Sequence, residues 1–312
     1  MTGLTEPSEW TGTSSDPNDE QFGDVVETAT LDSASEYDAV IVGEPYDGAV
    51  IGRRGAANGP GAIRSELAST KTHHLDTGPV GSIADLGDVD VSAGDSASVE
   101  SIQETVREVT SQVYDADAFP VFLGGDNSLT FPNAVPLLDD HSLGVVSFDA
   151  HLDCREPHDG PTSGTPYRQL HEAGLDEFAV VGARHFETST TYVKYVQDED
   201  GLILTPEEVS ADPSGAIARA LAAMGGVDAI YVSVDLDVLD QSHAPGVSAP
   251  TPGGLSSRDL FELLSEVARN TRIAGLEVVE CAPPLENGNR TVRTASRAIA
   301  HFLAEHGGEA DE

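Results

Sequence analysis

Two short segments carry most of the side chains that could do metal chemistry. Alternate side chains of an extended segment share a face, so Asp149, His151 and Asp153 point the same way, each about 7 Å from the last. Asp235 and Asp237 repeat this spacing. Facing carboxylates and an imidazole are unfavourable unless a cation neutralises them. The segments therefore indicate a divalent metal site, and oxygen and nitrogen ligands without thiolate favour Mn²⁺ over Zn²⁺, Ni²⁺ or Co²⁺.

Each segment follows an apolar run that can position it. The runs at residues 143–148 and 229–234 have the composition of central parallel strands that are buried on both faces. Ligands bind at the carboxyl ends of such strands, so the two segments can converge there. A lone Asp-x-Asp after a strand is more often a helix cap or a solvated loop, but two copies with a histidine make metal binding the better interpretation.

Predicted strands and helices alternate along the rest of the chain. Further strands are expected at residues 39–43, 83–88, 119–123, 178–182, 202–205 and 275–279. Helices are expected at residues 97–114, 131–138, 167–173, 190–197, 215–224, 257–270 and 291–305. This alternation is typical of a parallel, doubly wound sheet.

The length of 312 residues suits one α/β domain. We expect this domain at residues 37–308. Residues 1–36 are rich in Ser, Thr, Pro and acidic side chains, which predicts an N-terminal arm that is mostly irregular. Its aromatic residues Trp10 and Phe22 could pin it to the domain or to a neighbouring subunit.

The composition excludes several classes of partner. The formal charge is −38, from 54 acidic and 16 basic residues that are scattered along the chain. Such a surface repels nucleic acid and anionic membranes, and it suits a salt-loaded cytoplasm, where screening removes the mutual repulsion of carboxylates. Two cysteines cannot form a disulfide framework, and no apolar run approaches the roughly 18 residues of a membrane span. We therefore expect a halophilic, cytoplasmic protein.

Three ordered motifs resemble the metal motifs of the ureohydrolase family, which includes arginase, agmatinase and formimidoylglutamase. They are GGDNS at residues 124–128, FDAHLD at 148–153 and SVDLDVLD at 233–240. The resemblance runs from about Tyr37 to the last helix. It implies an arginase-like, three-layer α/β/α domain with a mostly parallel, doubly wound sheet. It also implies two Mn²⁺ ions per subunit and a homo-oligomer, either a trimer or a hexamer.

The resemblance also implies roles for single residues. The metal ligands would be Asn127, Asp149, His151, Asp153, Asp235 and Asp237. Asn127 stands where the family has a histidine, and its amide oxygen binds a metal more weakly than imidazole does. Asp153 would orient a metal-bridged hydroxide and shuttle its proton, and Glu280 would pair with the cationic nitrogens of the substrate. The expected reaction is hydrolysis of a C–N bond in a linear amidine.

Weaker signals concern the substrate. Arg155 could bind a carboxylate, and Ser163 stands where agmatinases have a catalytic histidine; both features resemble formimidoylglutamases. Arg184 is a further candidate for the carboxylate, and His158 could replace the missing histidine. These features imply hydrolysis of N-formimidoyl-L-glutamate to L-glutamate and formamide in histidine degradation. The alternatives are an agmatinase or guanidinobutyrase-type amidinohydrolase, or a non-catalytic homologue that acts as an oligomer partner.

Overall fold

The structure, a computed structural model, describes residues 3–91 and 97–306. Its centre is a nine-stranded sheet of order β1-β5-β2-β6-β11-β10-β7-β8-β9, and each neighbouring pair in it is parallel. The strands are β1 (Glu27–Thr28), β2 (Ala39–Gly43), β5 (Ile83–Asp88), β6 (Phe119–Leu123), β7 (Leu143–Phe148), β8 (Glu177–Val181), β9 (Leu202–Leu204), β10 (Ala229–Asp235) and β11 (Ile273–Val279). A separate antiparallel hairpin pairs β3 (His73–His74) with β4 (Gly78–Pro79).

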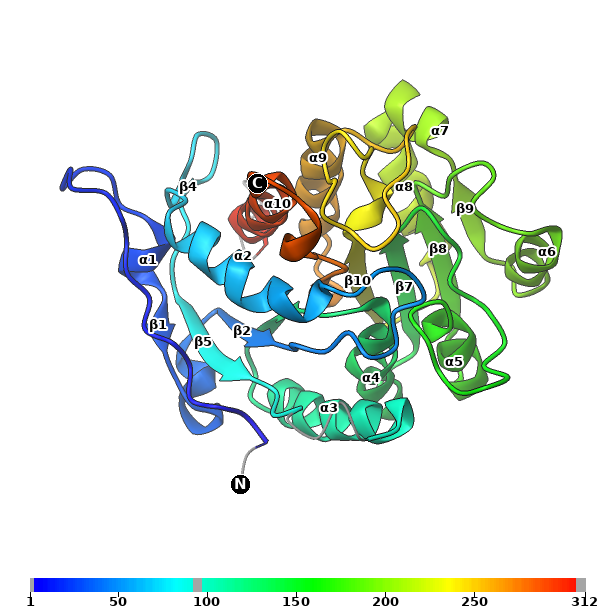
Figure 1. Ribbon diagram of the computed structural model, residues 1–312, viewed down its shortest axis with the longest axis horizontal. Helices are drawn as coiled ribbons and strands as arrows, with labels where there is room; N and C mark the ends of the chain where they lie inside the picture. The colour runs from blue at the N-terminus through cyan, green and yellow to red at the C-terminus, as the bar shows by residue number, and fades with distance from the viewer. Residues whose placement is uncertain (1–2, 92–96, 307–312) are drawn as a thin grey trace.

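Helices cover both faces of the sheet and complete the three layers (Figure 1). One face carries α2 (Gly59–Ala68), α8 (Pro213–Ala223), α9 (Ser257–Ala268) and α10 (Arg290–Glu305). The other face carries α3 (Val99–Tyr114), α4 (Thr130–Ala134), α5 (Pro166–Ala173) and α6 (Thr190–Asp198). The short helices are α1 (Phe22–Val25), α7 (Pro206–Ala211) and the 3₁₀ turns η1 (Leu31–Glu36), η2 (Ala56–Asn58), η3 (Asn127–Leu129), η4 (Val135–Asp139), η5 (Leu236–Val238) and η6 (Pro283–Leu285).

The central strands are apolar on both sides because each faces a helix layer. In β2, Ile41 packs into the core beneath α2 and α10, whereas Val40 and Val42 pack into the core beneath α3. All three side chains are fully buried. This explains why the strands read as continuous apolar runs and confirms the doubly wound arrangement predicted from the sequence.

The predicted elements begin and end within two residues of the observed ones, with one exception. The helix expected at residues 131–138 is split into α4 and the 3₁₀ turn η4, since Pro136 has no N–H to donate to the preceding turn. The hairpin and α7 were not predicted. No helix among the described residues is long and apolar enough to cross a membrane.

The N-terminal segment, expected to be mostly irregular, contains α1, β1 and η1. Phe22 is fully buried against the domain, and the indole N–H of Trp10 donates to Asp85 Oδ2 over 2.8 Å. The side chain of Arg64 donates to the same buried carboxylate. Both aromatic residues thus hold this segment against the chain's own sheet.

Candidate metal centre

The candidate residues gather because their strands are neighbours. β6, β11, β10 and β7 are adjacent in the middle of the sheet, and their carboxyl ends lie at one edge. Asn127 follows β6, Asp149 follows β7, Asp235 ends β10 and Glu280 follows β11. Four chain segments that are distant in sequence therefore supply one site.

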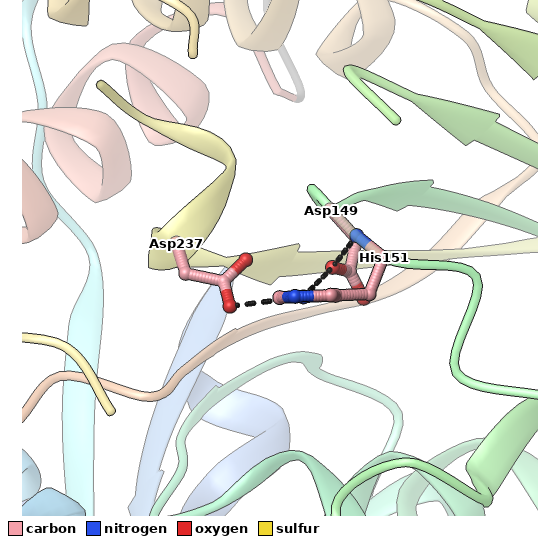
Figure 2. Close-up of side chains that lie close together, drawn as sticks. All are labelled: Asp149, His151 and Asp237. Carbon is pink, nitrogen blue, oxygen red and sulfur yellow. Dashed lines mark hydrogen bonds and ion pairs between the residues drawn. The ribbon is translucent and has the colours of Figure 1, made fainter. Parts of the chain in front are cut away.

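One group of possible ligands consists of Asp149, His151 and Asp237 (Figure 2). His151 Nδ1 lies 3.1 Å from Asp237 Oδ2 and 3.5 Å from Asp149 Oδ1. Each carboxylate also accepts a backbone N–H: Asp149 Oδ1 accepts that of His151, and Asp237 Oδ1 accepts that of Ala150. These backbone contacts hold the carboxylates toward one another.

A second group consists of Asp149, Asp153 and Asp235. In each group the candidate ligand atoms lie within 4.8 Å of one another, and Asp149 belongs to both groups. Asp149 Oδ2 is buried and has no hydrogen-bond partner among the described residues. A shared carboxylate between two clusters of oxygen and nitrogen donors fits two divalent cations.

The pKa values of the site residues also indicate that the site needs cations. Burial, and then the charge of Asp153, raise the pKa of Asp149 well above its usual range. Burial and the charge of Asp237 do the same to the pKa of Asp235. Burial alone would lower the pKa of His151, but the Asp237 carboxylate raises it. The carboxylates need protons or cations to share the site.

Asn127 is held between the site and the core. Its Nδ2 donates to Asp153 Oδ2 over 2.7 Å, and its Oδ1 accepts the hydroxyl of Thr130 over 2.6 Å. The carboxamide thus touches Asp153, and its contribution as a metal ligand stays a prediction.

Asp153 and Glu280 share an unusual backbone conformation. Their φ angles are 34° and 62°, in the left-handed region that favours glycine. Glu280 Oε1 accepts the backbone N–H of Asn127, whereas Glu280 Oε2 is buried without a partner in the described part of the chain. Backbone strain of this kind tends to occur at functional sites, where the surrounding structure imposes it.

The closely packed backbone at Gly125 supports Glu280. The Glu280 N–H donates to the carbonyl oxygen of Gly125, and a Cβ at Gly125 would lie 1.7 Å from the carbonyl oxygen of Tyr46. Only glycine allows this approach. Gly125 therefore permits the close approach of the two backbones beside the site.

The residues proposed for substrate choice lie in different surroundings. Arg155 is exposed, and its guanidinium carbon lies 5.8 Å from the ring centroid of Tyr192. Ser163 is buried, and its hydroxyl accepts the backbone N–H of Ile51. His158 is exposed, and its ring faces Glu156 at 2.9 Å. Among the described residues, Arg155 is thus exposed and forms no ion pair with a carboxylate, while Ser163 joins two loops.

Arg184, which the sequence suggests as a substrate ligand, contacts the backbone of two neighbouring loops. Arg184 is buried, and its guanidinium donates to the carbonyl oxygens of Thr251, Asp237 and Leu239 and to the Thr251 hydroxyl. Both terminal nitrogens donate to other residues of the protein, so this arginine supports the loop that carries Asp237.

Three residues near the site were not predicted. Glu187 Oε2 lies 3.7 Å from His151 Nε2. Thr130 and Glu277 are fully buried and hydrogen-bonded to each other behind Asn127. The sequence gives one signal for Glu277, which is a charged residue within an otherwise apolar strand. Glu187 lies in a loop, and no sequence pattern there predicts that it approaches His151.

The comparisons with known proteins cover most of the chain. The family described as "Arginase family" matches residues 37–304. A formimidoylglutamase of Halobacterium salinarum is 58% identical over 302 residues, which cover 95% of this chain and 97% of that protein. A formimidoylglutamase of Bacillus subtilis is 33% identical and covers 88% of this chain and 89% of its own length.

Solved structures agree with the described fold. The crystal structure of formimidoylglutamase from Bacillus subtilis has a TM-score of 0.87 at 28% identity and covers 94% of both chains. The crystal structure of Trypanosoma cruzi formiminoglutamase with Mn²⁺ has a TM-score of 0.79 at 29% identity and covers 89% of this chain and 98% of that one.

Proposed function

Because this chain belongs to the arginase family, we propose that it hydrolyses N-formimidoyl-L-glutamate to L-glutamate and formamide at a centre of two Mn²⁺ ions. The observation that carries the proposal is the 58% identical formimidoylglutamase, which matches this chain over nearly its full length. The two overlapping groups of carboxylate and imidazole donors agree with this function. Water cleaves the bond between the formimidoyl carbon and the nitrogen that stays with glutamate.

The residues present fit the metal pair. The site offers buried carboxylates of raised pKa, an imidazole, and Asp149 Oδ2 without a partner among the described residues. The proposed ligands are Asn127, Asp149, His151, Asp153, Asp235 and Asp237. When bound, two Mn²⁺ ions lower the pKa of water toward neutrality and supply hydroxide as the nucleophile.

Asp153 is proposed to hold and move the proton of the nucleophile. Its carboxyl is partly buried at the site, and in the metal-free protein desolvation raises its pKa to about 6. A carboxylate beside the nucleophile can accept its proton and return it to the departing nitrogen. Asn127 Nδ2 restrains the rotation of this carboxyl through its contact with Oδ2.

Glu280 is proposed to bind the formimidoyl nitrogens. Burial and the charge of Asp126 raise the pKa of Glu280 well above its usual range, so an isolated negative charge is unfavourable there. A cationic substrate group provides the missing counter-charge, and Glu280 Oε2 is available to accept its N–H. This contact orients the planar carbon toward the nucleophile.

Arg155 is proposed to select the carboxylates of glutamate. Its guanidinium is exposed and unpaired with any carboxylate in the described ion pairs, and its position two residues after Asp153 supports a location near the site. A cation there attracts a dicarboxylate and repels the ammonium end of agmatine. Ser163 would contribute by holding the adjoining loops together.

Further properties follow from the same proposal. The catalytic domain is proposed at residues 37–308, of which residues 92–96 and 307–308 lie outside the described part of the chain, and residues 1–36 are an N-terminal segment that packs on it. The net charge of −38 supports work in a salt-rich cytoplasm, and family membership supports a trimer or hexamer of identical chains. The charge likewise argues against nucleic acid and anionic membranes as partners.

The decisive experiment compares substrates and metals. The purified protein is incubated with N-formimidoyl-L-glutamate, agmatine, arginine and guanidinobutyrate, and products are identified by mass spectrometry. We expect glutamate and formamide from the first substrate, loss of turnover after dialysis against a chelator, and recovery with Mn²⁺. Preference for agmatine or guanidinobutyrate would instead establish another amidinohydrolase. Full activity after verified metal removal would overturn the metal-dependent mechanism.

A further inference from the structure

A chain of hydrogen bonds connects the buried core to the candidate metal centre. Thr130 Oγ1 lies 2.5 Å from Glu277 Oε1 and 2.6 Å from Asn127 Oδ1. Asn127 Nδ2 then lies 2.7 Å from Asp153 Oδ2. Glu277, Thr130 and Asn127 are each 0% exposed. The contacts thus run without interruption from Glu277 on β11 to the carboxylate of Asp153.

Glu277 is surrounded by hydrogen-bond donors. Its Oε2 accepts the hydroxyl of Tyr231 over 2.9 Å and Nδ2 of Asn133 over 3.0 Å. The side chain of Ser233 also bonds to this carboxyl. Burial raises the pKa of Glu277, and these hydroxyl and amide donors oppose that shift by stabilising the ionised form. Glu277 can therefore act as an acceptor on both of its oxygens.

The hydroxyl of Thr130 has one proton but two neighbouring acceptors. It can donate to Glu277 Oε1 or to Asn127 Oδ1, but not to both. If the hydroxyl donates to Asn127 Oδ1, its oxygen turns a lone pair toward Glu277 Oε1. Glu277 must then carry a proton, because otherwise two lone pairs would face each other. If the hydroxyl donates to an ionised Glu277, the carboxamide of Asn127 is better satisfied after a half-turn, with Nδ2 donating to Thr130 Oγ1.

The two arrangements present opposite ends of the carboxamide to the site. In the first, Nδ2 points at Asp153, as observed, and an N–H cannot bind a cation. In the second, Oδ1 faces Asp153 Oδ2, and a divalent cation between the two oxygens removes their repulsion. Metal binding by Asn127 therefore requires the arrangement that an ionised Glu277 favours.

We propose that Glu277 is a positioning residue for the metal centre: through Thr130 it turns the oxygen of the Asn127 carboxamide toward the cation. The proposal rests on the metal centre of the proposed function. It gives a reason for a charged residue inside an apolar strand, and it explains how an asparagine can serve as a ligand at this position.

The test is calorimetric titration of the metal-free protein with Mn²⁺. In Glu277→Gln, the amide nitrogen should face Thr130, because Asn133 and Tyr231 already supply donors to the other oxygen. Thr130 would then donate to Asn127 Oδ1 and hold Nδ2 toward the site. We expect the affinity of one of the two Mn²⁺ positions to fall about 10- to 100-fold, as for other residues that orient metal ligands.

Four further variants separate orientation from packing. Thr130→Ser keeps the hydroxyl and should bind both ions as the wild type does, whereas Thr130→Val should weaken one position. The double variant Glu277→Gln/Thr130→Val should match Thr130→Val alone, because glutamine acts only through the hydroxyl. Glu44→Gln is the matched control: Glu44 is also fully buried and accepts from Asn133, but it makes no hydrogen bond to Thr130.

The outcomes are distinct for the two proposals. If wild-type protein binds no pair of Mn²⁺ ions, the proposed function and this inference both fail. If it binds two ions and Glu277→Gln binds them equally well, only the inference fails. Equal losses in Glu44→Gln and Glu277→Gln would also overturn it, since they would indicate general core damage. Thermal unfolding of each metal-free variant measures that damage independently.

Discussion

The backbone N–H of Arg184 donates to the carbonyl oxygen of Ala150, and its guanidinium donates to the carbonyl oxygen of Asp237. One buried arginine thus joins the loop after β7 to the loop after β10, the two segments that carry most of the proposed ligands. The distance between these loops sets the separation of their carboxylates. Through these contacts Arg184 holds the two loops together, and its role toward the substrate stays a prediction.

Arg184→Lys should therefore lower the free energy of unfolding. Activity with both Mn²⁺ positions occupied should change less. A single amine cannot reach Thr251 and Asp237 together, and hydrogen bonds of charged donors are worth about 1.5–3 kcal/mol. We expect the free energy of unfolding to fall by this amount in urea titration. Arg53→Lys is the control, because Arg53 donates to the carbonyl of Val247 from an exposed position. Equal stability of both variants would contradict the bridging role.

Asp153→Asn should abolish catalysis while preserving the fold. Asparagine tolerates the left-handed backbone of residue 153, so the local structure can remain. The neutral amide cannot hold the proton of the nucleophile and is a weaker ligand, so kcat should fall at least about 10³-fold. Assays of kcat with excess Mn²⁺ check this prediction. Asp198→Asn is the control, because Asp198 is exposed. A loss below tenfold would exclude Asp153 as the proton carrier.

Metal-free and Mn²⁺-loaded protein should respond to pH in opposite directions. Folding raises the pKa of Asp153 from 3.8 to about 6 and raises that of His151. The folded state then binds more protons than the unfolded state, so the stability of metal-free protein should fall as the pH rises from about 5 to 8. With Mn²⁺, protons compete with the ions, so stability should rise over this range. Thermal unfolding at intermediate pH values measures both slopes; parallel slopes would contradict the assignment.

Arg155→Ala tests substrate selection. A charge-assisted contact to a carboxylate is worth about 1.5–3 kcal/mol, so kcat/KM for N-formimidoyl-L-glutamate should fall roughly 10- to 150-fold. Turnover of agmatine should stay flat or rise, because the repelling cation is gone. Arg168→Ala is the control, since Arg168 is only partly exposed and its guanidinium carbon lies 3.4 Å from the ring centroid of Tyr195. Unchanged kinetics with the dicarboxylate would remove Arg155 from the site.

Salt should stabilise the protein. Its carboxylates are spread over the folded surface, and the Debye length shrinks from about 10 Å at 0.1 M salt to about 3 Å at 1 M. Mutual repulsion therefore weakens, and the midpoint of thermal unfolding should rise with KCl. Scans in sucrose at matched water activity control for dehydration. A midpoint that does not change between these salt concentrations would refute adaptation to a salt-rich interior.

The strands and the ligand spacing could be predicted because their signals are local. β7 and β10 are continuous apolar runs, and Asp149, His151 and Asp153 follow at alternating positions, so pattern alone places them at a strand end. The role of Arg184 could not be predicted, because its partners at Thr251 and Asp237 lie more than fifty residues away. Nor does the short sequence Asn127-Ser128-Leu129-Thr130 reveal that Thr130 meets a glutamate from β11.

The left-handed backbone at Asp153 and Glu280 has a consequence for engineering. Each such residue costs of order 1–3 kcal/mol, which glycine would not incur. A screen of a random library for thermostability alone should thus enrich glycine at both positions and return inactive proteins. Selection for turnover has to accompany any search for stability in this scaffold.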